Sequence, residues 1–191
     1  QNFKDIKKYP VIFFGNEFFD ALPIKQFSRI DGLLYEKYYS LNNSNKITEI
    51  YKKVSKKNLS EIKSYRSLQK LDFIEFPKMG FNELKKMIKK ISRLKGGLLL
   101  IDYSYLKPNN NDTLQSILKH KKNDLLNNLG KADVTSLVNF KLLKEHFKKN
   151  NLKVKKVVTQ SFFLKKMGIL ERANNLSIKM NFKEQSNLYL R

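Results

Sequence analysis

Residues 11–23, Val-Ile-Phe-Phe-Gly-Asn-Glu-Phe-Phe-Asp-Ala-Leu-Pro, decide how the rest of the chain is interpreted. The apolar run Val11–Phe14 ends in a glycine, which is typical of a short buried strand in a parallel sheet. Asn16, Glu17 and Asp20 follow at once, and open α/β sheets bind ligands beyond the carboxyl ends of their strands. The stretch therefore predicts a polar site, although Asn16 and Asp20 could equally cap a turn or helix while Glu17 stays solvated.

A second strand with an acidic end follows a helix. Apolar residues from Phe81 to Ile91 recur at helical spacing, with Asn82 as the expected N-cap and Gly96-Gly97 as the stop. The apolar run Leu98–Ile101 comes next and ends in Asp102-Tyr103. The chain thus runs from a strand through a long connecting segment and a helix to a second strand. This order is typical of a crossover connection, so we expect two parallel strands whose polar ends lie at one edge of the sheet.

The long excursion between these strands is expected to be an antiparallel insertion, residues 24–76. Asp31-Gly32 separates the apolar-rich segments 24–29 and 33–39, and this dipeptide favours the type I′ turn of a hairpin. The segment 47–54 is expected to continue the meander.

The C-terminal half is expected to alternate helices with one more strand. The pattern predicts a short helix over 113–120 capped by Asp112, and a turn or helix start at 133–135. It also predicts a helix capped by Asn139 that ends at Asn150-Asn151. Residues 154–159 are expected to form a third strand near the sheet edge. Further helices are predicted over 160–167, with Gly168 as the stop, and over 169–191.

Composition indicates a globular domain. The chain has 191 residues, of which 41% are hydrophobic, and this is enough for one domain with a core. No apolar run is long enough to cross a bilayer, and the first residues lack the pattern of a signal peptide. Because the chain opens with Gln1 and stops at Arg191 within a polar–apolar pattern, we expect a fragment of a longer protein.

The formal charge of +22 allows two interpretations. Lysine and arginine contact phosphates, so the charge could mark a nucleic-acid-binding surface. The lysines, however, recur in nearly every segment, and no aromatic–basic repeat of an RNA-binding sheet is present. We favour biased amino-acid usage over a nucleic-acid partner, and other anionic partners stay open.

Several classes of site are missing from the sequence. The chain has no cysteine, which excludes disulfides, thiolate catalysis and cysteine-ligated metals. Because it has only two histidines, we do not expect a histidine-rich zinc site. None of the seven glycines forms Gly-x-Gly, so the chain lacks a phosphate-cradling loop. A nucleophile elbow centred on serine is missing too.

The acidic residues suit a cationic ligand. On a helix, Glu17 and Asp20 would share a face, and a planar guanidinium is the best partner of a bidentate carboxylate. Asp102 could join them from the second strand end, or it could be a turn residue. Tyr103 could line the same site or be a half-buried packing ring.

Several blocks in order resemble the MidA-like family of S-adenosylmethionine-dependent methyltransferases, which includes the mitochondrial complex I assembly factor that methylates an arginine. They are Asn16–Pro23, Gly96–Tyr103, Asp112–Gln115 with Lys119–Lys121, Gly130–Thr135 with Val138–Phe140, and Thr159–Gln160 leading to Phe163–Leu164 and Met167–Ile169. Departures from the family pattern are Ser104 for glycine, Lys131 for an acid and Asn139 for aspartate.

The resemblance implies an α/β class I methyltransferase fold, Rossmann-like, with a mostly parallel sheet. Residues 1–191 would form part of the catalytic domain, N-terminally incomplete, with the antiparallel insertion at 24–76. The family's glycine-rich S-adenosylmethionine loop would lie before Gln1 and a final strand after Arg191. The cofactor-binding residues of this chain are therefore unknown, and alone it is expected to be inactive.

The resemblance also implies methylation of an arginine in a protein substrate, such as a respiratory complex I subunit. In that case Glu17 and Asp20 orient the guanidinium, and Asn16 positions the substrate or the methyl donor. Asp102, Tyr103 and His120 are further candidates for the substrate cleft, although His120 could have a surface or packing role. The location would be cytoplasmic in a bacterium and the mitochondrial matrix in a eukaryote.

Two other classes of function stay open. The first is a non-catalytic assembly or binding module that keeps the fold without binding a cofactor, which the missing glycine loop permits. The second is a basic nucleic-acid-binding domain.

Overall fold

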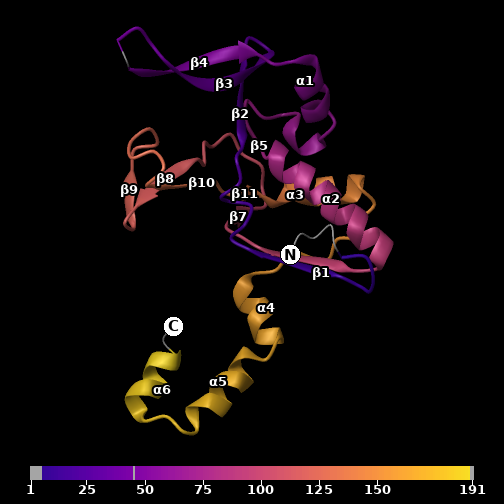
Figure 1. Cartoon of the computed structure of the whole chain (residues 1–191), viewed down its shortest axis with the longest axis vertical. Helices are drawn as coiled ribbons and strands as arrows, with labels where there is room; N and C mark the ends of the chain where they lie inside the picture. The colour runs from indigo at the N-terminus through magenta and orange to yellow at the C-terminus, as the bar shows by residue number, and fades with distance from the viewer. Residues whose placement is uncertain (1–5, 45, 190–191) are drawn as a thin grey trace. The chain divides into compact units, whose positions relative to one another are not determined.

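The computed structural model describes residues 6–44 and 46–189, and it divides into two compact units, residues 1–154 and 155–191 (Figure 1). The strands and helices of the first unit are β1 Ile12–Asn16, β2 Lys25–Ile30, β3 Leu33–Leu41, β4 Ile47–Lys53, α1 Lys56–Lys63, the 3-10 helix η2 Arg66–Leu68, β5 Phe73–Phe76, α2 Lys78–Leu94, β6 Gly97–Ile101, β7 Ser104–Tyr105, β8 Gln115–Leu118, β9 Lys121–Asn123, β10 Asp133–Thr135, β11 Val138–Asn139 and α3 Phe140–Lys149. The second unit contains the helices α4 Gln160–Lys166, α5 Ile169–Ser177 and α6 Phe182–Tyr189.

Strands β1 and β6 form the expected parallel pair. Their register places Ile12 opposite Gly97 and Asn16 opposite Ile101, so both strands end at the same level. The short strands β7 and β11 are parallel as well. Parallel and antiparallel pairs occur together with helices, which confirms the α/β class. The polar residues that follow β1 and β6 consequently begin side by side.

The turn from α2 into β6 depends on a glycine without a side chain. Helix α2 ends at Leu94, and its C-cap residue Lys95 has a left-handed backbone with φ 55°. The next residue is Gly96, and a Cβ atom there would lie 1.9 Å from the carbonyl oxygen of Val11. That oxygen accepts a hydrogen bond from the N–H of Gly97 at 2.9 Å. The close approach fixes the start of the β1–β6 register.

Helix α2 buries the predicted apolar face, but its start was predicted wrongly. It begins at Lys78 with Pro77 at the N-cap position, and Asn82 lies within the helix. Proline presets a helical φ and needs no N–H partner, so it favours the start of a helix ahead of a later asparagine.

Residues 25–76 form a four-stranded antiparallel sheet in the order β4-β3-β2-β5. Asp31 and Gly32 both have positive φ, 49° and 75°, as the predicted type I′ turn between β2 and β3 requires. The sequence did not predict β5, which pairs with β2 and carries a buried glutamate, Glu75, within an apolar run. Residues 55–70, expected as loop or weak helix, contain α1 and η2.

The helix predicted over 113–120 is wrong. Residues 115–118 form β8, which pairs antiparallel with both β9 and β10. Lys119 and His120 have positive φ, 50° and 61°, and make the turn between β8 and β9. The Oδ1 atom of Asp112 accepts a hydrogen bond from the N–H of Leu114 two residues ahead, which is a turn rather than a helix cap. Pairing with neighbouring strands has overridden the local helix preference of this segment. Residues 133–135, which were expected to form a turn or a helix start, form strand β10 instead.

A single core joins the antiparallel sheet, α2 and α3. Helix α3 follows the prediction, because the Asn139 side chain accepts a hydrogen bond from the N–H of Leu142 at 3.0 Å and Asn150 is the C-cap. The largest fully buried side chains are Phe27, Leu68, Ile74, Phe76, Phe81, Leu84, Leu142, Ser116 and His146.

The expected strand at 154–159 is absent from the structure. Residues 153–159 have no strand pairing, and β1 and β6 pair only with each other among the described residues. Alternating lysine and valine can only form a strand when a sheet edge supplies hydrogen bonds.

The helices of the second unit agree with the prediction over the residues that the structure describes, and residues 190–191 of the predicted helical stretch lie outside them. Helix α4 ends at Lys166 and is followed by Gly168 with φ 83°, and α5 and α6 are helical. Within the described part of both units, no helix is long and apolar enough to cross a membrane.

Candidate active site at the ends of β1 and β6

Asn16 and Glu17 lie exposed at the end of β1. The backbone of Glu17 is left-handed, with φ 47°, and its N–H donates to the carbonyl oxygen of Ile101 at 2.9 Å. The chain therefore leaves the sheet in a tight turn at this point. A left-handed non-glycine residue costs about 1–2 kcal/mol, so the surrounding contacts must hold it.

Asp20 lies in the turn that follows, and it is buried. Its side chain is 9% exposed, and its Oδ1 atom has no hydrogen-bond partner among the described residues. The N–H of Ser136 donates to its carbonyl oxygen at 2.9 Å. Residues 17–24 form no helix, so Glu17 and Asp20 do not share a helix face. A buried carboxylate oxygen without a partner is costly, so a donor from a water molecule or a ligand would stabilise it.

Asp102 comes directly after β6 and contacts the same turn. Its Oδ2 atom accepts hydrogen bonds from the N–H groups of Phe18 at 3.2 Å and Phe19 at 2.8 Å. Its Oδ1 atom accepts from the N–H of Tyr103 at 2.9 Å. Burial raises the pKa of the Asp102 carboxyl above its ordinary value, the N–H of Phe19 opposes this shift, and the neighbouring carboxylate of Asp20 adds to it.

The two remaining candidates are placed differently. The Tyr103 side chain is 60% exposed, next to Asp102, while its carbonyl oxygen accepts from the N–H of Val138 at 2.8 Å. His120 is exposed in the β8–β9 turn, and Figure 1 shows this hairpin apart from the end of β1. The structure thus brings Asn16, Glu17, Asp20, Asp102 and Tyr103 together and leaves His120 elsewhere.

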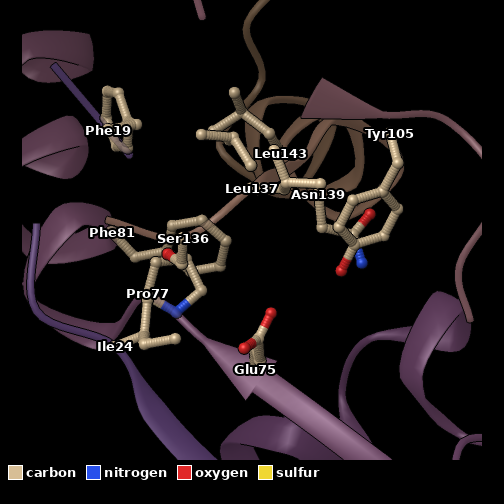
Figure 2. A pocket seen from close by; sticks show the side chains of 11 residues that line it. Phe19, Ile24, Glu75, Pro77, Phe81, Tyr105, Ser136, Leu137, Asn139 and Leu143 are labelled. Atoms are coloured by element: carbon tan, nitrogen blue, oxygen red, sulfur yellow. The ribbon is translucent and has the colours of Figure 1, made fainter. Parts of the chain in front are cut away.

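A small cavity adjoins the turn (Figure 2). Its volume is about 20 Å³, which is room for one water molecule. Phe19 and Phe81 form part of the apolar wall. Figure 2 shows the Glu75 side chain pointing from its strand into the space between Pro77 and Ser136 on one side and Tyr105 and Asn139 on the other. Burial raises the pKa of Tyr105 to about 12 and also raises the pKa of Glu75.

The sequence-based search missed two polar residues of this cavity, Glu75 and Tyr105. Glu75 is 8% exposed and accepts hydrogen bonds from the Gln26 side chain at 3.1 Å and from the N–H and hydroxyl of Thr113. An acid inside the run Phe73-Ile74-Glu75-Phe76 was the signal that could have identified it. Tyr105 carried no comparable signal.

The described residues do not fit a whole S-adenosylmethionine molecule at these strand ends. The chain contains no Gly-x-Gly, and the cavity beside Phe19 has the volume of one water molecule. Nor do the described residues contain a group of three or more histidine, aspartate or glutamate side chains placed to hold a metal ion. What the site offers is carboxylate groups, which suit a cation.

Comparisons with known proteins agree on one family. The model of an S-adenosyl-L-methionine-dependent methyltransferase family matches residues 1–158. The chain is 28% identical over 180 residues to the mitochondrial protein arginine methyltransferase NDUFAF7 homolog of Caenorhabditis elegans, a match that covers 91% of this chain and 42% of the relative. It is 26% identical over 188 residues to protein arginine methyltransferase NDUFAF7, mitochondrial, of Xenopus laevis, covering 94% of this chain and 42% of the relative.

Two crystal structures of COG1565 superfamily proteins from Burkholderia thailandensis have the same fold. Their TM-scores to this chain are 0.71 and 0.72, at 16% identity over 95% of this chain. The first of those proteins is bound to S-adenosyl-homocysteine. The matches cover 49% and 50% of the two neighbours, so the chain spans about half their length and less than half that of the curated relatives.

Proposed function

The chain belongs to the MidA-like family of S-adenosyl-L-methionine-dependent methyltransferases, and we propose that it forms the acceptor-binding side of an enzyme that methylates an arginine in a protein substrate. The observation that carries the proposal is the buried Oδ1 atom of Asp20, which has no partner among the described residues; the charge of Asp20 also helps to raise the pKa of the Asp102 carboxyl. The names of the NDUFAF7 relatives supply the reaction and the substrate class.

A guanidinium group suits this arrangement on chemical grounds. Arginine stays protonated in proteins and offers five N–H donors in one plane. One donor pairs with the Oδ1 atom of Asp20, which removes the cost of an unsatisfied buried acceptor. The exposed carboxylate of Glu17 holds a second edge of the guanidinium, and Asn16 orients either the substrate or the methyl donor. Two anions on one cation fix the plane in which the reacting nitrogen lies.

S-adenosylmethionine supplies the methyl group in this family. Because the described residues do not form its pocket, the role of this chain is to bind and orient the acceptor. We extend the proposal to a respiratory complex I subunit as substrate on the family resemblance. The mitochondrial matrix is the matching location for a eukaryotic protein, since the relatives are named mitochondrial.

A second candidate is a binding module that keeps the fold without transferring a methyl group. The lack of Gly-x-Gly and the small cavity favour it. Such a module would still bind a cationic side chain at Asp20.

Calorimetric titration of S-adenosylmethionine into the complete protein separates the two candidates. The proposed enzyme binds the cofactor with one site per chain, and S-adenosyl-homocysteine competes for that site. If the complete protein binds neither compound, the binding module replaces the enzyme. A parallel titration with nonspecific RNA across a salt series tests the basic charge. Steeply salt-dependent RNA binding without cofactor binding would favour a nucleic-acid-binding domain instead.

A further inference from the structure

We infer that Asp102 is a positioning residue and not a substrate ligand: its carboxylate holds the backbone of the turn that presents Glu17 and Asp20. The inference rests on the proposed function, because it assigns Asp102 a positioning role within that same site. It also replaces the sequence-based expectation that Asp102 contacts the substrate.

Both carboxylate oxygens of Asp102 are already engaged within the chain. Oδ2 accepts from two successive N–H groups, those of Phe18 and Phe19, and Oδ1 accepts from the N–H of Tyr103. Successive backbone N–H groups that point at one oxygen are a general way of binding an anion. Here the anion is a side chain of the protein itself, so Asp102 has little capacity left for a substrate.

Apart from those to Asp102, the hydrogen bonds from this turn to other parts of the chain hold only its two ends, while the Phe19 ring packs in the core. At the start, the N–H of Glu17 donates to Ile101 at 2.9 Å, and at the end, Ser136 donates to the carbonyl oxygen of Asp20 at 2.9 Å. Between them, only Asp102 accepts from the N–H groups of Phe18 and Phe19 in the described structure. The left-handed backbone of Glu17, at φ 47°, would relax if that middle part were released.

Anchoring and substrate binding predict different effects. An anchor protects the amides of Phe18 and Phe19 from hydrogen exchange, and its loss misplaces the Glu17 and Asp20 side chains. A substrate ligand leaves those amides unchanged and affects only the binding of the substrate. Residue-resolved hydrogen exchange and steady-state kinetics on the same variants therefore distinguish the two roles.

The test compares Asp102→Ala and Asp102→Asn with the wild-type protein. We expect exchange at Phe18 and Phe19 to accelerate by about tenfold or more in Asp102→Ala, because hydrogen bonds to a charged acceptor are strong. Asp102→Asn keeps one acceptor oxygen and should accelerate it less. The amides of α2 and α3 should keep their protection in both variants. Asp124→Ala is the matched control, since its carboxylate accepts from Leu126 in another turn.

Activity of the same variants completes the test. We expect kcat for methyl transfer to fall in the order wild type, Asp102→Asn, Asp102→Ala, in parallel with the gain in exchange at the turn. Unchanged exchange at Phe18 and Phe19 would overturn the positioning role, and so would faster exchange with unchanged kcat. If the wild-type protein transfers no methyl group, the proposed function fails whatever the amides show.

Discussion

The Nδ1 atom of His146 in α3 lies 2.7 Å from the hydroxyl oxygen of Tyr65, and both side chains are buried in the core. The imidazole is fully buried and stacks on the ring of Phe81 with 3.9 Å between centroids. Burial lowers the pKa of His146 from 6.5 to about 4, and the positive charges of Lys85 and Lys149 contribute to the shift. The native structure therefore contains the neutral imidazole.

This buried histidine makes the stability of the protein depend on pH. The unfolded chain takes up the proton near pH 6.5, whereas the folded chain resists it until about pH 4. The contribution of the neutral His146 to the free energy of unfolding is therefore fully present above about pH 6.5 and is lost as the pH falls toward 4. The loss from this residue is up to about 3 kcal/mol, since each pKa unit corresponds to about 1.4 kcal/mol. Urea unfolding at several pH values between 4 and 7 measures it.

The variant His146→Phe isolates the contribution of this residue. It should be less stable at pH 7 by about 1–3 kcal/mol, because the Tyr65 hydroxyl loses its partner. Its stability should also change less between pH 6.5 and 4. His120→Gln, at the exposed β8–β9 turn, is the matched histidine replacement outside the core. A His146→Phe protein with the same pH dependence as the wild type would show that the carboxylates alone cause it.

The link between α2 and β6 should tolerate no side chain at Gly96. An added Cβ would lie 1.9 Å from the carbonyl oxygen of Val11, so Gly96→Ala must displace the backbone that starts the β1–β6 pair. We expect a loss of about 3 kcal/mol or more in unfolding free energy. Gly97→Ala is the matched control, because a Cβ there meets no atom within 4 Å. Equal effects of the two substitutions would contradict the close approach of Gly96 to Val11.

Replacement of Asp20 should leave the protein as stable or more stable, and it should weaken the binding of the arginine substrate. Asp20→Asn removes a buried carboxylate whose Oδ1 atom has no partner among the described residues and whose charge helps to raise the pKa of Asp102. We expect the melting temperature to stay or rise, with a gain of up to about 1 kcal/mol. Affinity for an arginine-containing peptide should fall by about tenfold or more, because a charge-assisted hydrogen bond is lost. Asp133→Asn, on an exposed strand, should change neither quantity. A large loss of stability in Asp20→Asn would show that the carboxylate has a structural role instead.

Local signals in the sequence were enough to predict much of the fold. The type I′ turn at Asp31-Gly32 and the cap of α3 at Asn139 depend on residues close together in the chain. The parallel pairing of β1 with β6 followed from two apolar runs separated by a helix. These features could be predicted because the residues concerned restrict the backbone directly.

Features that depend on distant partners could not be predicted. Residues 113–120 have helix-compatible composition, but pairing with residues 121–123 and 133–135 makes them a hairpin. Asp102 was placed at the correct edge of the sheet, yet nothing in the sequence shows that the N–H groups of residues 18 and 19 occupy its carboxylate. The burial of Asp20 likewise depends on how the turn packs against residue 136.

Methyl transfer to arginine is the most direct measurement of the central claim. The complete protein should transfer a labelled methyl group from S-adenosylmethionine to an arginine in a protein or peptide substrate. Glu17→Gln should lower kcat/KM by about a hundredfold or more while the protein remains folded, because it removes an anion that orients the guanidinium. Glu83→Gln, which breaks only a surface pair with Lys86, should leave turnover unchanged. Retained turnover in Glu17→Gln, or labelling of a residue other than arginine, would contradict the account.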